Sequence, residues 1–114
     1  MMFESIPVNA LYPRWLTARD KGEACTIIDV RTPEEYAEVH VPSAKLIALS
    51  TLMARAHEVP KQGDVYLICR SGARSAQAAA FLAQQFGHAN LVNVSGGTMA
   101  WANAGYPVER EGQA

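Results

Sequence analysis

The sequence predicts an α/β domain with a mainly parallel sheet and helices on both faces of that sheet. Apolar runs of four to six residues recur along the chain, as in strands that are buried on both faces. Between these runs lie segments that begin and end with residues typical of helix termini. The 114 residues suit one domain, and a content of 49% hydrophobic and 18% charged residues excludes a disordered chain. We expect this domain over residues 1–108, followed by a polar tail over residues 109–114.

The first elements in chain order are a short strand near residues 6–8 and a helix at about residues 11–20. The apolar run 25–30 predicts the next strand. After it, Thr32 supplies a capping hydroxyl, Pro33 suits the first helical position, and Glu35 lies three residues beyond the cap. A short helix therefore starts at this point.

The second half of the chain repeats this alternation. Strands are expected at residues 45–49, 65–69 and 91–94, and helices at residues 52–57, 74–86 and about 96–104. The helix at residues 74–86 is rich in alanine and other strong helix formers, and Gly87 is placed to end it in the left-handed conformation.

Charge and cysteine usage exclude several classes of protein. Ten Lys and Arg against eleven Asp and Glu give a net charge of -1, so no broad positive field is available for nucleic acid or an anionic membrane. The longest apolar run, residues 78–83, is far shorter than the ~20 residues of a membrane span. We find no secretory signal pattern and expect a cytoplasmic location. Cys25 and Cys69 are too far apart for a redox pair or a zinc site, so we expect free thiols, no metal and no cofactor.

The chemistry is concentrated where the strand at residues 65–69 runs into residues 69–75, C-R-S-G-A-R-S, which we call the Cys loop. Cys69 sits at the carboxyl end of a predicted parallel strand, where open α/β sheets bind their ligands. A tight loop that opens a helix aims backbone N–H groups and the positive helix end inward. Such an anion site around a thiol favours the thiolate, and Arg70 and Arg74 add positive charge.

These residues resemble the single-domain rhodanese, or thiosulfate sulfurtransferase-like, family. The resemblance covers residues 27–108 and is specific because several motifs agree: Asp29-Val30-Arg31 with Glu34, Glu35 and Tyr36, His40-Val41-Pro42-x-Ala44, the Cys loop, and Gly96-Gly97 with Trp101 and Gly105-Tyr106-Pro107-Val108. It implies a five-stranded, mainly parallel sheet flanked by helices on both faces. Two family glycines are replaced, by Val39 and Ser43, which puts the local loop geometry in question.

The resemblance implies that Cys69 is a catalytic nucleophile that becomes a persulfide. The residues expected to bind substrate or persulfide are Arg70, Ser71, Gly72, Ala73, Arg74 and Ser75. The expected partners are a small anionic donor such as thiosulfate, a cyanide or thiol acceptor, and a protein of a sulfur relay. No nucleic acid and no membrane are expected.

Two other readings compete with a thiosulfate sulfurtransferase. One is a persulfide carrier that receives its sulfur from a protein partner. The presence of Cys69 does not distinguish such a carrier from an enzyme that turns over a small donor. The other is a cysteine phosphatase or arsenate reductase, whose loops hold five residues between Cys and Arg where Cys69 and Arg74 enclose four. Arg74 either contacts substrate directly or structures the loop by donating hydrogen bonds to the loop carbonyls.

Overall fold

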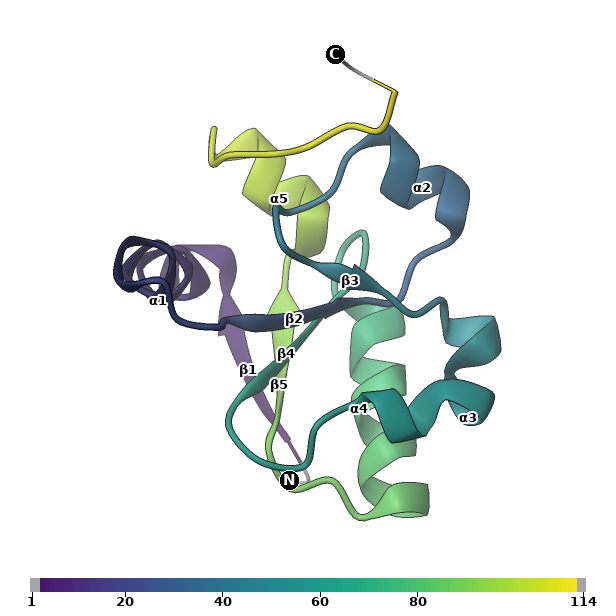
Figure 1. Ribbon diagram of the computed structural model, residues 1–114. Coiled ribbons are helices and arrows are strands. Elements are labelled where there is room, and N and C mark those ends of the chain that lie inside the picture. The colour runs from purple at the N-terminus through teal and green to yellow at the C-terminus, as the bar shows by residue number, and fades with distance from the viewer. Residues whose placement is uncertain (1–2, 113–114) are drawn as a thin grey trace.

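The computed structural model describes residues 3–112 and contains one sheet of five parallel strands (Figure 1). The spatial order is β1-β5-β4-β2-β3, so β4 and β5 lie in the interior of the sheet. The strands are β1 (Glu4–Pro7), β2 (Thr26–Asp29), β3 (Lys45–Leu46), β4 (Val65–Ile68) and β5 (Leu91–Ser95). The predicted five-stranded parallel α/β fold is confirmed.

Helices cover both faces of this sheet (Figure 1). The α-helices are α1 (Val8–Lys21), α2 (Pro33–Glu38), α3 (Leu52–Arg55), α4 (Ala73–Phe86) and α5 (Gly97–Asn103), and two 3₁₀ turns, η1 (Leu49–Thr51) and η2 (Ala56–Glu58), flank α3. The core against α3 and α4 is separate from the core against α1 and α5. Within residues 3–112, no helix has the length and apolar character needed to cross a membrane.

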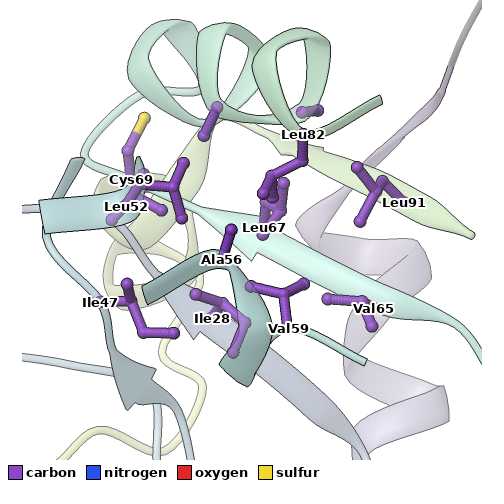
Figure 2. Close-up of a cluster of buried hydrophobic side chains, with 13 residues drawn as sticks. Ile28, Ile47, Leu52, Ala56, Val59, Val65, Leu67, Cys69, Leu82 and Leu91 are labelled. Atoms are coloured by element: carbon purple, nitrogen blue, oxygen red, sulfur yellow. The ribbon is translucent and has the colours of Figure 1, made fainter. Parts of the chain in front are cut away.

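Strand β4 shows how one run of residues serves both cores. Val65, Leu67 and Cys69 face α4, whereas Tyr66 and Ile68 face α1 and α5. Figure 2 shows Val65, Leu67 and Cys69 following one another along β4, with the sulfur of Cys69 on the side of α4. The alternation follows from the two-residue repeat of a strand, and it explains why both faces of β4 had to be apolar.

The structure shifts two predicted boundaries. The first strand ends at Pro7, and α1 begins at Val8, three residues before the predicted start at about residue 11. Strand β3 has two residues where five were expected, because the chain turns into η1 at Leu49. The backbone still follows β2 there, since Ile47 N–H donates to Asp29 O at 2.9 Å and Leu49 N–H to Val30 O at 3.0 Å.

The predicted helix signals are confirmed at α2 and α4. The Thr32 hydroxyl accepts from Glu35 N–H at 3.2 Å, and the Glu35 carboxylate accepts from Thr32 N–H at 3.2 Å, which together form a capping box. Gly87 ends α4 with φ 75°, in the left-handed region.

The two positions where family glycines are replaced behave differently. Val39 is extended, with φ -166° and ψ 136°, a conformation open to any residue. Ser43 has φ 73°, the one positive φ among the described non-glycine residues. The loop thus keeps a glycine-type conformation at Ser43 and bears the strain that a Cβ creates there.

We predict that Ser43→Gly stabilises the protein by about 0.5–1 kcal/mol, because relief of left-handed strain exceeds the extra entropy of an unfolded glycine. Urea unfolding at neutral pH measures the difference. Ser50→Gly, in η1, is the matched control and should destabilise the fold, because its φ is not positive. Equal effects at both positions would contradict the assignment of strain to Ser43.

Candidate functional site

The site is built around Cys69, which follows the last residue of β4 and is 1% exposed. Strands β2 and β5 flank β4, so the thiol lies at the centre of the carboxyl edge of the sheet. The Cys loop then leads into α4, whose N-cap is Gly72. A parallel sheet opens its ligand sites along this edge, as the sequence predicted.

Two groups of the loop lie within hydrogen-bond distance of the Cys69 sulfur. Gly72 N–H donates to Sγ at 3.1 Å, and the Ser75 hydroxyl lies 3.3 Å from Sγ. Burial alone would raise the pKa of the thiol. The Ser75 hydroxyl and the backbone N–H groups of Ser75, Gly72 and Ser71 outweigh burial, so the pKa of Cys69 lies below its ordinary value. The site therefore favours a thiolate.

The start of α5 holds the Cys loop in place through its carbonyl groups. Thr98 N–H donates to Cys69 O at 2.8 Å, and Met99 N–H donates to Arg70 O at 3.1 Å. Gly96 N–H donates to Ser71 O at 3.0 Å. Because the C=O and N–H of one peptide group point in opposite directions, carbonyls held toward α5 turn the loop N–H groups toward the sulfur.

Two glycines permit this close approach. A Cβ on Gly97 would lie 2.4 Å from Cys69 O and 2.5 Å from Arg70 O, and Gly97 has φ 61°. Gly72 has φ 112°, and a Cβ there would lie 3.3 Å from the Cα of Ser95. The loop and α5 pack backbone against backbone, and a side chain at Gly97 would force them apart.

The two arginines of the loop occupy different environments. Arg74 forms a bidentate ion pair with Glu35 of α2, with N–O distances of 2.7 and 2.8 Å. Its guanidinium therefore holds the loop to α2 through a carboxylate, rather than through hydrogen bonds to the loop carbonyls as the sequence had suggested. Arg70 is exposed, and its side chain makes no hydrogen bond or ion pair with the described part of the chain.

The remaining predicted loop residues also take distinct positions. Ser71 and Ala73 are exposed, whereas Ser75 is completely buried. Ser71 and Gly72 act through their backbone, and Ser75 acts through both its backbone and its hydroxyl.

Three residues of the site were not identified from the sequence as site residues: Gly97, Glu35 and Asn93. Asn93 lies on β5 and sits 2.6 Å from the Ser75 hydroxyl through its Oδ1. A polar side chain within the apolar run at residues 91–94 was the available signal for it. Gly97 was visible as half of a Gly-Gly pair, but the loop it touches lies about thirty residues earlier in the chain.

Other candidate groups lie apart from the sulfur or serve the fold. Arg31 and Asp29 form a buried ion pair at 2.8 Å, and Arg31 also donates to Val39 O at 2.6 Å, which fixes the turn after β2. Cys25 lies at the opposite edge of the sheet, roughly 16 Å from Cys69 along the strands. A disulfide between the two is excluded by this separation. Among residues 3–112, no group of three His, Cys, Asp or Glu could hold a metal.

The fold agrees with comparisons to known proteins. A family model described as Rhodanese-like domain matches residues 12–104. A rhodanese-related protein of Thermoplasma volcanium superposes with a TM-score of 0.82 at 32% identity, covering 96% of this chain and all of that one. The chain belongs to the rhodanese-like family.

Curated relatives point to sulfur transfer as the general chemistry. A sulfurtransferase of Allochromatium vinosum is 43% identical over 86 residues, which are 75% of this chain and 79% of that protein. The putative sulfur carrier protein YrkF of Bacillus subtilis is 38% identical over 82 residues. The match covers 72% of this chain and 44% of YrkF, so this chain corresponds to less than half of YrkF.

We predict that Gly97→Ala lowers the reactivity of the Cys69 thiol at neutral pH by about tenfold, because a displaced loop loses the hydrogen bonds that favour the thiolate. The rate of iodoacetamide alkylation of Cys69 measures this effect. Gly105→Ala is the matched control, since Gly105 also has a positive φ, of 79°, but meets nothing within 4 Å. An equal loss in both variants would mean that backbone strain, rather than the contact with the loop, is responsible.

We predict that Glu35→Gln destabilises the fold by about 0.5–1 kcal/mol at neutral pH, because Gln keeps the helix cap but loses the ion pair with Arg74. Arg74 holds the pKa of Glu35 down to about 2 from 4.5. A lowered folded-state pKa stabilises the protein above the unfolded value, and this contribution disappears as the pH falls from 4.5 toward 2. Urea unfolding across this range should show the wild type and the variant converging, and a constant difference would contradict the prediction.

Proposed function

We propose that this protein is a sulfurtransferase in which Cys69 takes a sulfane sulfur from an anionic donor such as thiosulfate and carries it as a persulfide. The observation that carries the proposal is the convergence of N–H and O–H donors on one buried sulfur. These donors stabilise negative charge without a metal or a proton shuttle.

In the first step, the Cys69 thiolate attacks the outer sulfur of thiosulfate. A sulfur–sulfur bond forms to Cys69 as the sulfur–sulfur bond of thiosulfate breaks, and sulfite leaves with the electron pair. The product is an anionic persulfide. Its negative charge lies on the terminal sulfur, one S–S bond of about 2 Å beyond Sγ. We expect the N–H groups that converge on Sγ to stabilise this charge as well, because charged acceptors form the stronger hydrogen bonds.

In the second step, a thiophilic acceptor attacks the terminal sulfur of the persulfide. Cyanide yields thiocyanate, a thiolate yields a new persulfide, and both regenerate the Cys69 thiolate. Neither step needs a general acid, since sulfite and thiolate leave as stable anions. This agrees with a site in which no titratable side chain of residues 3–112 bonds to the sulfur.

Arg70 is the residue that we propose to attract the donor. It is exposed next to Cys69, and the described part of the chain provides no partner for its guanidinium. A positive charge at the opening raises the local concentration of a dianion such as thiosulfate. Arg74, by contrast, is already neutralised by Glu35.

A carrier charged by a protein partner is the second candidate, favoured by the similarity to YrkF. It uses the same persulfide and differs only in the source of the sulfur. A cysteine phosphatase is disfavoured, because Arg74 turns to Glu35 instead of the anion site.

The test is intact-protein mass spectrometry under non-reducing conditions after treatment with thiosulfate and then with cyanide. We predict that the wild type gains the mass of one sulfur atom and loses it to cyanide with formation of thiocyanate. Cys69→Ala should gain nothing, and the matched control Cys25→Ala should behave as the wild type, because Cys25 lies at the opposite edge of the sheet.

Each other outcome has a defined meaning. Sulfur gain in Cys69→Ala would overturn the proposed mechanism. No gain in the wild type with thiosulfate, followed by a gain with a cysteine desulfurase and cysteine, would favour the carrier. Hydrolysis of p-nitrophenyl phosphate that disappears in Cys69→Ala would favour the phosphatase.

A further inference from the structure

A row of four polar side chains runs from the edge of the sheet to the reactive sulfur. Ser5 on β1, Asn93 on β5, Ser75 on α4 and Cys69 after β4 follow one another in space. Asn93 Nδ2 lies 3.3 Å from Ser5 Oγ, and Asn93 Oδ1 lies 2.6 Å from Ser75 Oγ. Ser75 Oγ lies 3.3 Å from Cys69 Sγ. Ser75 and Asn93 are 0% and 5% exposed, so water does not readily replace these partners.

The number of hydrogen atoms that these side chains can donate allows two arrangements of the hydrogen bonds. Ser75 has one hydroxyl hydrogen but two neighbours that accept it, the Asn93 amide oxygen and the Cys69 sulfur. The hydroxyl bonds the sulfur only when Asn93 does not take the hydrogen. The amide of Asn93 presents either its oxygen or its NH₂ group to Ser75, because the two ends have nearly the same shape.

We propose that Asn93 is a positioning residue that sets the direction in which the Ser75 hydroxyl donates. With a neutral thiol, Cys69 S–H donates to Ser75 Oγ, Ser75 donates to the amide oxygen, and the amide NH₂ donates to Ser5. With a thiolate or persulfide, the side-chain amide of Asn93 flips, so that its oxygen and its NH₂ group exchange places. Its NH₂ group then donates to Ser75 Oγ, Ser75 donates to the sulfur, and the Ser5 hydroxyl donates to the amide oxygen.

Both arrangements leave every polar group bonded, which makes the row suited to a sulfur that changes charge during a reaction cycle. The proton that leaves the thiol goes to solvent, and no proton passes along the row. An apolar residue at position 93 would support neither arrangement. A carboxylate there would accept the Ser75 hydrogen bond whether the sulfur is neutral or charged.

Charged groups around Cys69 do not account for the role of Asn93. Arg70 follows Cys69 directly, Arg74 of α4 is paired with Glu35 of α2, and Asp29 of β2 is paired with Arg31. Strand β5 and helix α5 contain no ionisable side chain. Among residues 3–112, the side-chain amide of Asn93 has hydrogen-bond partners only in two neutral hydroxyls, those of Ser75 and Ser5.

The test follows the pH midpoint of iodoacetamide alkylation of Cys69, in a Cys25→Ser background so that a single thiol reacts. The proposal deepens the proposed function, but alkylation needs no sulfur donor. A failure of sulfur transfer, measured separately by mass spectrometry, is thus distinguishable from a failure of this inference. The variants are Asn93→Leu and Asn93→Asp, each made with Ser75 and with Ser75→Ala, and thermal unfolding shows which are folded.

With Ser75 present, we expect Asn93→Leu to raise the alkylation midpoint by about half a unit, a roughly threefold loss of thiolate at a fixed pH below the midpoint, because Ser75 loses the bond that orients it. With Ser75→Ala, the same change should have no effect. A residue that only joins β1 to β5 would alter thermal stability and leave the midpoint unchanged. An unchanged midpoint in the presence of Ser75, or an equal shift without it, overturns the inference.

Asn93→Asp keeps the proposal testable if the leucine variant does not fold. Its carboxylate raises the midpoint both by repulsion and by capturing the Ser75 hydrogen, and only repulsion remains with Ser75→Ala. We expect a rise of about one unit with Ser75 and a clearly smaller rise with Ser75→Ala. Equal rises in the two backgrounds would contradict a role through Ser75.

Discussion

The hydrogen bonds from the start of α5 to the carbonyl groups of the Cys loop are the contacts on which the site depends. They hold three consecutive peptide groups, with carbonyls at Cys69, Arg70 and Ser71, against Gly96, Thr98 and Met99. A single peptide turned over would present a carbonyl oxygen where an N–H is needed, and this would repel an anionic sulfur. The reactivity of the Cys69 thiol thus depends on α5, a helix that has no charged side chain and acts on the loop through backbone N–H groups.

The fold provides this support through strand order. Because β5 lies beside β4, the segment that follows β5 emerges next to the segment that follows β4, and α5 begins beside the first residues of the Cys loop. Strand β2 lies on the other side of β4, and the helix after it, α2, reaches the loop through Glu35 and Arg74. The loop is held on two sides by elements that neighbouring parallel strands place there.

Local signals in the sequence were sufficient for most strand segments, the α2 cap and the end of α4, because each depends on residues within a few positions of one another. The location of the thiol at a strand end was also predictable. The partner of Arg74 was not, since Glu35 lies 39 residues earlier and only the packed fold brings them together. Nor was the bond between Ser75 and Asn93, which depends on the register between β5 and α4. Strand β3 was predicted too long because Ile47, although outside the regular strand, is buried and still donates its N–H to β2, so its apolar character does not mark the end of the strand.

The donors around Cys69 also bear on why this site suits sulfur transfer in the proposed chemistry. A guanidinium facing the anion would bind a dianion such as sulfite or a phosphoryl group more tightly than the monoanionic persulfide. Here the Arg74 guanidinium is paired with Glu35, and the groups that bond the sulfur are dipolar N–H and O–H groups. Such donors stabilise the thiolate and the persulfide to a similar extent, because the two carry the same charge. The free energy of transfer is then set mainly by the donor and the acceptor, so that one loop both takes up sulfur and releases it.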